Sequence, residues 1–231
     1  MADLESFMNG SRLMAFAQGG TLVYVPHAFR DDEIEELAAF MRDNTFAMVV
    51  SSGDGGAPVA THVPVAVASE GGTIVLRGHF AKANPHGRRL EAGETLVVFT
   101  GPHAYVSPRH YDARESVPTW NYRAVHAYGH ARITERDGTL DGLHALIDEH
   151  EADDRAPWDG LSERYREGML GGVVGFEIVV ERLEGAAKLS QNKRLREQER
   201  IADALLGSDD HAARATGCEM HRRLDSDVDR D

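Results

Sequence analysis

The stretch FAMVVSSGDGGAPVATHVPVAV, residues 46–67, shows most directly what kind of fold the chain adopts. Two runs rich in β-branched residues, 46–52 and 59–67, flank the glycine-rich segment GDGGAP. Apolar runs on either side of a glycine-rich turn are typical of two consecutive antiparallel strands. We therefore predict a strand, a turn and a second strand here.

The residues before this hairpin have the period of a helix. In YVPHAFRDDEIEELAAFMRDN, residues 24–44, the apolar residues Ile34, Leu37, Ala38 and Met41 recur at intervals of three and four. Acidic residues are concentrated where such a helix would begin, and the helix dipole favours negative charge there. We predict one amphipathic helix ahead of the strands.

Strand and helix patterns continue to the end of the chain. We predict further strands at residues 71–80, 94–101, 121–133 and 171–185, and helices at residues 138–151, 161–170 and 192–206. Residues 101–122 contain three prolines and are predicted to be an ordered loop. Many short strands with helices at intervals, without regular strand–helix–strand alternation, favour a mixed β-barrel over a doubly wound sheet.

The two ends of the chain differ from its middle. Residues 1–20 lack periodicity, so we predict a flexible extension that ends at the Gly19–Gly20 pair. Residues 208–231 are rich in aspartate and are predicted to be a loose acidic tail. The barrel domain, with its helices, would then span residues 21–207.

Charge and composition exclude several classes of protein. The formal net charge of −13 argues against direct binding to nucleic acid, although a halophilic source would also explain the acidity. No apolar run approaches the roughly 20 residues that a membrane span needs. One cysteine, Cys218, excludes an intramolecular disulfide and favours the reducing cytoplasm. The sequence also lacks the G-x-S-x-G, P-loop and G-x-G-x-x-G patterns of serine hydrolases, P-loop nucleotidases and Rossmann dehydrogenases.

The segment RGHFAKANPHGRRL, residues 77–90, reverses the sign of the charge locally. Besides His79 and Asn84 it carries the basic residues Arg77, Lys82, Arg88 and Arg89. Basic side chains and free backbone N–H groups between a strand end and a helix start suit a phosphate. A solvated turn is the alternative, and the charge reversal favours an anion site.

The histidines do not predict a metal site. His126 and His130 are four residues apart in a predicted strand, which places them about 13 Å apart and too far for one ion. A lone strand histidine such as His62 is more often a hydrogen-bonded structural residue than a ligand. The segment KLSQN, residues 188–192, is by itself a weak signal and fits a helix cap equally well.

The segment VPTWNYRAVHAYG, residues 117–129, concentrates aromatic residues. Either they pack a barrel core, or they line a cleft for a flat, conjugated ligand. From periodicity alone, the segment is a strand whose aromatic residues, Tyr122 and Tyr128 among them, pack the core, and His126 is interpreted as structural.

Six segments of this chain, taken in order, resemble the PaiB family, described as FMN-binding negative transcriptional regulators. They are YVPHAFR, ATHVPV, RGHFAKANP, GPHAYVSPRHY, VPTWNYRAVHAYG and KLSQN, and the similarity covers about residues 23–205. The resemblance implies an α+β fold, a split β-barrel with peripheral helices, which usually forms a homodimer with ligand sites at the subunit interface.

The resemblance also implies where FMN would bind. The flavin phosphate would meet Lys82 and Asn84, with His79 nearby, and the isoalloxazine ring would lie against strands. The residues expected beside that ring are His62, Trp120 and Asn121, and Lys188 and Gln191 of KLSQN complete the candidate set. This analogy assigns cofactor contacts and no catalytic residue.

Three functions remain open from the sequence. The first is an FMN-binding protein that acts as an indirect transcriptional regulator. The second is a heme-binding enzyme on the same scaffold, because PaiB-like relatives include piperazate synthases, which form an N–N bond, and more distant relatives degrade heme. His62 or His79 would then be the axial ligand, and the residues do not discriminate between two flat, anionic cofactors. The third is a non-catalytic binding module.

Overall fold

The computed structural model describes residues 24–52, 56–151 and 156–228. The strands are β1 (Arg30–Asp31), β2 (Phe46–Ser52), β3 (Pro58–Glu70), β4 (Thr73–Ala81), β5 (Glu94–Val106), β6 (Thr119–Ile133) and β7 (Val173–Lys188). The α-helices are α1 (Ile34–Asp43), α2 (Arg136–His150), α3 (Ala156–Asp159), α4 (Glu163–Leu170), α5 (Leu195–Leu206) and α6 (His211–Val228). Short 3₁₀ turns are η1 (His27–Phe29), η3 (Pro85–Arg88), η4 (Leu90–Ala92) and η5 (Pro108–His110). The extension predicted for residues 1–20 lies outside the described residues.

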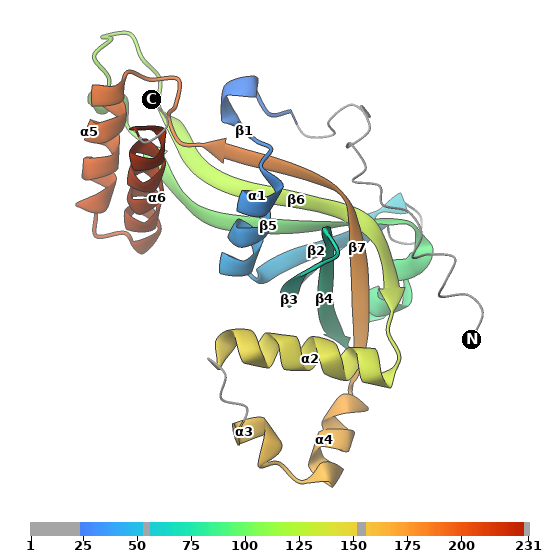
Figure 1. The fold of residues 1–231 in the computed structure, drawn as a ribbon. Coiled ribbons are helices and arrows are strands. Elements are labelled where there is room, and N and C mark those ends of the chain that lie inside the picture. Colours follow the sequence, from blue (N-terminus) through green and yellow to red (C-terminus); the bar gives the residue numbers. More distant parts are fainter. Residues whose placement is uncertain (1–23, 53–55, 152–155, 229–231) are drawn as a thin grey trace.

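Six antiparallel strands close into a barrel, as Figure 1 shows. Their order is β7-β4-β3-β2-β5-β6, and β6 pairs back with β7, while the short β1 adds to the far end of β7. The β6–β7 register shifts after Tyr128, and a Cβ atom on Gly129 would lie 2.2 Å from the Val179 carbonyl oxygen. Only glycine permits so close an approach of the two strands. The predicted mixed β-barrel is confirmed.

The helix α1 fills one mouth of this barrel. Leu37, Phe40 and Met41 are almost fully buried and join the barrel's interior side chains in one core. The predicted amphipathic helix is thus confirmed, although Ile34 at its first turn is 39% exposed. Truncating a buried leucine or methionine in such a core typically costs about 2–5 kcal/mol, so α1 is integral to the barrel.

The remaining helices cover two separate regions of the barrel (Figure 1). The helix α2 packs across β3, β4 and β7, and α4 contacts both α2 and β7. At the other end, α5 and α6 form a hairpin against β5, with a second core that includes Val106, Ile201 and Met220. None of the helices in the described ranges is long and apolar enough to cross a membrane.

The C-terminal segment corrects the sequence prediction. The expected loose acidic tail is wrong for residues 211–228, because they form the helix α6. Ala213, Thr216 and Met220 recur at intervals of three and four and are buried, so one face of α6 packs against the protein. The acidic composition hid this short apolar stripe.

The segment 101–122 is likewise not all loop. β5 continues to Val106 and β6 begins at Thr119, so that Tyr105 pairs with Trp120. The β5–β6 register shifts between Thr100 and His103, where Pro102 lacks a backbone N–H group and interrupts the ladder. The prolines therefore mark a bulge and the tip of a long hairpin.

Candidate functional site

Seven of the eight candidate cofactor residues fall into two groups at opposite ends of β7. Near its start lie His79, Lys82 and Asn84, and near its end lie Trp120, Asn121, Lys188 and Gln191, whereas His62 lies on β3 opposite Met48 of β2. Lys82 donates its backbone N–H to the Gly172 carbonyl at 2.8 Å, just before β7 begins, whereas Lys188 is the last residue of β7. The 16 residues of β7 span about 50 Å along the strand. One chain therefore does not bring the eight residues together.

The first group contains polar groups with unused bonding capacity. His79 lies on β4 opposite Gly175 of β7, and its shielded Nδ1 atom has no hydrogen-bond partner within the described residues. Burial lowers the pKa of His79, which favours the neutral imidazole. Lys82 is exposed and pairs with no carboxylate in the described part of the chain. These groups are free to meet a ligand.

Asn84 instead holds the turn after β4. Its side-chain oxygen accepts the His86 N–H at 3.0 Å and caps η3. His86 is fully buried, and its ring nitrogens contact the hydroxyls of Ser51 at 2.9 Å and Thr61 at 2.8 Å. This network fixes the segment that carries Lys82, and the sequence gives no direct signal for it.

A cleft of about 370 Å³ opens beside Lys82, between α2, α4 and the start of β7. Its polar lining includes Arg136 and Glu167, which form an ion pair, and Thr134 and Thr139, whose hydroxyl oxygens lie 3.0 Å apart. Sequence reasoning does not find this cleft, because its residues come from three segments with no shared motif. It offers two cations and two hydroxyl donors in one place.

The second group presents an aromatic surface. Trp120 is 53% exposed and meets Tyr105 edge-on, with 6.1 Å between ring centroids. Tyr105 is 51% exposed, and the His103 ring centroid lies 6.0 Å from that of Trp120. Tyr128 is buried as interpreted, but Tyr122 is 37% exposed and points out of the barrel instead of into its core. Exposed rings on adjacent strands form a surface on which a flat ligand could stack.

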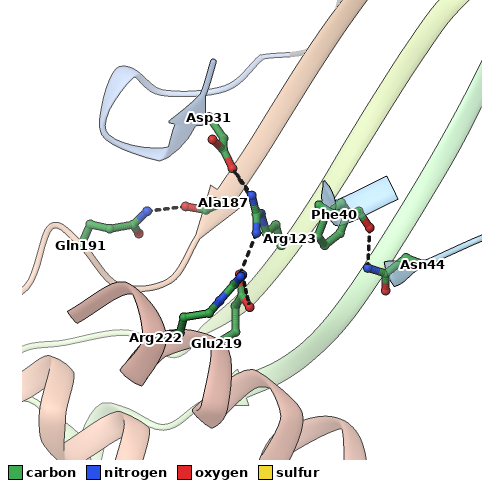
Figure 2. Close-up of polar contacts among 8 residues, drawn as sticks. All are labelled: Asp31, Phe40, Asn44, Arg123, Ala187, Gln191, Glu219 and Arg222. Carbon is green, nitrogen blue, oxygen red and sulfur yellow. Dashed lines mark hydrogen bonds and ion pairs between the residues drawn. The ribbon is translucent and has the colours of Figure 1, made fainter. Parts of the chain in front are cut away.

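The side chains of Asn121 and Gln191, also in this group, form hydrogen bonds within the protein. Asn121 is fully buried, accepts the Ser190 hydroxyl at 3.0 Å and contacts the Met220 sulfur at 3.2 Å. Gln191 accepts the Leu189 N–H at 2.7 Å and donates to the Ala187 carbonyl, as Figure 2 shows for the latter bond. These bonds leave little capacity for a ligand in a single chain.

Lys188 and Ser190 complete the structure of this turn. The ammonium of Lys188 donates to the Thr119 hydroxyl and lies 5.9 Å from the Phe29 ring centroid. Ser190 has a φ of 69°, and no other non-glycine residue in the described part of the chain has a positive φ. Such a conformation is costly and must be imposed by its surroundings, here by the bond to Asn121.

Arg123, beside this group on β6, is a buried charge that sequence reasoning does not find. Figure 2 shows its guanidinium between Asp31, at 2.7 Å, and Glu219 of α6, at 2.9 Å. The guanidinium also lies 4.7 Å from the Phe40 ring centroid. Arg123 therefore ties β1, α1 and α6 to the barrel wall.

A further region lies on the outer face of β3, β2, β5 and β6, where His62 and Phe46 are exposed and Met48, Val98 and His126 are half-buried. His62, Met48, Val98 and His126 lie opposite one another in a row across these four strands and point outward. Phe46, next to this row, is 69% exposed and its ring stacks on His62 with 6.0 Å between centroids. We call this row, together with Phe46, the open sheet face.

Comparison with known proteins identifies the family. A family model described as "Putative FMN-binding domain" matches residues 23–182. A protein of Bacillus subtilis (strain 168), "Protease synthase and sporulation protein PAI 2", is 37% identical over 209 residues, which cover 89% of this chain and 100% of that protein. This chain belongs to the PaiB family. An uncharacterised protein of Emericella nidulans is 30% identical over 214 residues, covering 73% of this chain and 84% of its own length.

Solved structures share the fold of this PaiB-family chain. The flavocytochrome Anf3 from Azotobacter vinelandii has a TM-score of 0.57 and 16% identity, covering 71% of this chain and 72% of its own. An FAD and heme binding protein from Mycobacterium smegmatis has a TM-score of 0.53 and 20% identity, covering 69% and 73%. The fold is the expected split β-barrel with peripheral helices.

Proposed function

We propose that this PaiB-family protein binds FMN as a homodimer, with each flavin between two protomers, and acts as an indirect negative regulator of transcription. The observation that carries the proposal is the division of the candidate residues between the two ends of β7. Each end has groups suited to one part of FMN, a basic cleft for the phosphate and exposed rings for the isoalloxazine. A second chain is needed to supply both parts to one ligand.

The residues present fit such a cofactor. Within the described residues, the Nδ1 of His79 has no hydrogen-bond partner and Lys82 forms no ion pair, so both suit an anionic group. Trp120 with Tyr105 suits a conjugated ring. FMN, when bound, supplies one- and two-electron redox chemistry at its ring system. Asn84 and His86 would hold the Lys82 segment in place, while Asn121 would fix the strand that carries Trp120.

The open sheet face supports the homodimer. It combines the exposed Phe46 with the half-buried Met48 and Val98 on the outer face of β2 and β5. An apolar surface of this kind favours association with another protein surface, and a face of the barrel can pair with its own copy around a twofold axis. His126 adds a shielded ring nitrogen that lacks a partner within the described residues.

An indirect regulatory role fits the charge of the protein. The net charge of −13 opposes contact with DNA phosphates, so regulation would act through the bound cofactor's chemistry or through another protein. The name of the B. subtilis relative, which refers to protease synthesis and sporulation, is consistent with a role in gene expression. A cytoplasmic location belongs to the same proposal.

The absorption spectrum of the purified protein, followed by fluorescence titration with FMN and FAD, tests the cofactor. We expect saturable FMN binding with one FMN per protomer and a sedimentation coefficient of a dimer. The variant Phe46→Asp should sediment as a monomer and lose FMN affinity together with dimerisation. Failure of the wild-type protein to take up either flavin would reject the flavin proposal.

Heme is the second candidate, on a specific observation. His62 presents an exposed imidazole beside the exposed Phe46, and a ring nitrogen of His79 has no partner in the part of the chain that the structure describes. Each could therefore be an axial ligand. Heme titration should then give a Soret band that shifts or disappears in His62→Ala or His79→Ala. No Soret band at saturating heme would reject this alternative.

A further inference from the structure

The cleft beside Lys82 contains an acidic side chain, Glu167, that neutralises one of its two cations. Among the described residues that line it, Lys82 and Arg136 are the cations and Glu167 is the only acid. Glu167 is on α4 and forms an ion pair with Arg136 on α2, and the hydrogen bond with Glu167 raises the pKa of Arg136. The two side chains are 48% and 56% exposed. An ion pair this exposed contributes little to stability and exchanges readily.

The floor of the cleft is fixed by packing. A Cβ atom on Gly175 would lie 2.4 Å from the hydroxyl oxygens of both Thr134 and Thr139, so these hydroxyls lie directly against the backbone of β7. Thr139 can donate either to Thr134 or to the Glu135 carbonyl, at 3.0 Å in each case. One hydroxyl can therefore turn to a ligand without leaving the other unsatisfied.

We propose that this cleft is the phosphate subsite and that Glu167 is an internal anion which the phosphate of the ligand displaces. This inference rests on the proposed binding of FMN. A phosphomonoester carries a charge of about −1.5 to −2 and three acceptor oxygens. It therefore satisfies Arg136 by paired hydrogen bonds, Lys82 by charge and a threonine hydroxyl by a further bond.

Glu167 would then set both affinity and selectivity. While it occupies Arg136, it lowers the positive potential of the cleft, so a weakly charged or neutral ligand gains nothing by entering. A dianionic phosphate carries more charge than the carboxylate and replaces it, leaving Glu167 to solvent on the exposed face of α4. The carboxylate thus weakens phosphate binding and makes it depend on the charge of the ligand.

The test compares Glu167→Gln with the wild-type chain in titrations with FMN and with riboflavin, which has the same ring but no phosphate. We expect Glu167→Gln to bind FMN about fivefold more tightly and riboflavin unchanged. The matched control is Glu163→Gln, because Glu163 is an exposed acid on the same helix but does not line the cleft. Its FMN affinity should equal that of the wild type.

Arg136→Gln gives an opposing measurement. It should weaken FMN binding by about tenfold and leave riboflavin binding unchanged, and inorganic phosphate should compete with FMN more strongly in Glu167→Gln than in the wild type. Circular dichroism of each variant checks that the fold is retained.

If the wild type binds FMN but Glu167→Gln gains no affinity, or gains it equally for riboflavin, this inference is wrong and the FMN proposal stands. If neither protein binds FMN, both fail.

Discussion

The two ends of β7 use their candidate residues differently. At the start of the strand, Lys82 and His79 have groups without a partner among the described residues. At its end, the side-chain amides of Asn121 and Gln191 form hydrogen bonds within the turn that leads into the α5–α6 hairpin. The first end is arranged to meet a ligand, and much of the second is arranged to hold the fold.

This difference shows that neighbouring residues of one sequence motif can have different roles, one in ligand binding and the other in stability. Within PTWNY, Trp120 is half exposed while its neighbour Asn121 is fully buried, because successive residues of a strand point to opposite faces. A motif that spans adjacent strand residues must therefore contain both a surface residue and a structural one. Substitutions at the two positions should have separable effects.

The largest effect should come from the buried ion pair beside the structural end. Asp31→Ala leaves the Arg123 guanidinium, whose side chain is 7% exposed, without its closest partner. We expect a loss of about 3–5 kcal/mol in the free energy of unfolding, measured by urea denaturation. Asp32→Ala, at an exposed neighbour, should change stability by less than about 0.5 kcal/mol. Equal losses in the two variants would contradict this role for Asp31.

The next effect contrasts Asn121 with Trp120. Asn121→Ala removes the acceptor of the Ser190 hydroxyl and should cost about 1–3 kcal/mol by the same assay. Trp120→Ala should leave stability nearly unchanged but weaken FMN binding in a fluorescence titration. An Asn121→Ala protein as stable as the wild type would show that the two ends of β7 do not differ as described.

Lys82 should affect ligand affinity alone. Lys82→Gln removes a charge from the cleft and should weaken FMN binding about tenfold, while its urea midpoint stays that of the wild type. Lys193→Gln is the matched control, because the Lys193 ammonium lies over the Tyr111 ring, 4.0 Å from its centroid, at the other end of the molecule. The same loss of affinity in both variants would mean that net charge, not the cleft, determines binding.

The smallest effect is a dependence of stability on pH. Burial lowers the pKa of His79 and of His126 below the ordinary value of 6.5, so the unfolded chain takes up protons first as the pH falls. Stability should therefore decrease below about pH 6.5, by at most about 1.4 kcal/mol per pH unit for each histidine. His79→Gln should flatten the curve of urea midpoint against pH between 5 and 7. A curve identical to that of the wild type would contradict the shift.

The local pattern of the sequence predicts much of the barrel. The hairpin of β2 and β3 and the helix α1 follow from period and turn residues, because these are local signals. The extension of β5 to Val106 could not be predicted in this way, because Pro102 and Pro108 are typical of a loop although the strands are paired here. The helix α6 is likewise hidden, because its buried stripe is short and aspartates are concentrated at both ends of residues 208–231.

The site is less predictable than the fold for a physical reason. The motifs point to Lys82 and Trp120, but no local pattern reveals that β7 separates them by its whole length. The cleft joins Lys82 to Arg136 and Glu167 only after α2 and α4 pack against β7. Arg123 also looks like an ordinary strand arginine until β1 and α6 supply its carboxylates. Such features depend on contacts that are remote in sequence.

The closure of β6 onto β7 also affects the tendency of this protein to aggregate, because it reduces the number of unpaired strand edges. Each of the six barrel strands has a neighbour on both sides along part of its length, and the strand added outside the barrel, β1, is two residues long. Stretches paired on one side only are short, such as residues 58–64 of β3, which pair with β2 but not with β4. The backbone therefore offers only short templates for strand-by-strand polymerisation, and encounters with other chains depend mainly on exposed side chains such as Phe46.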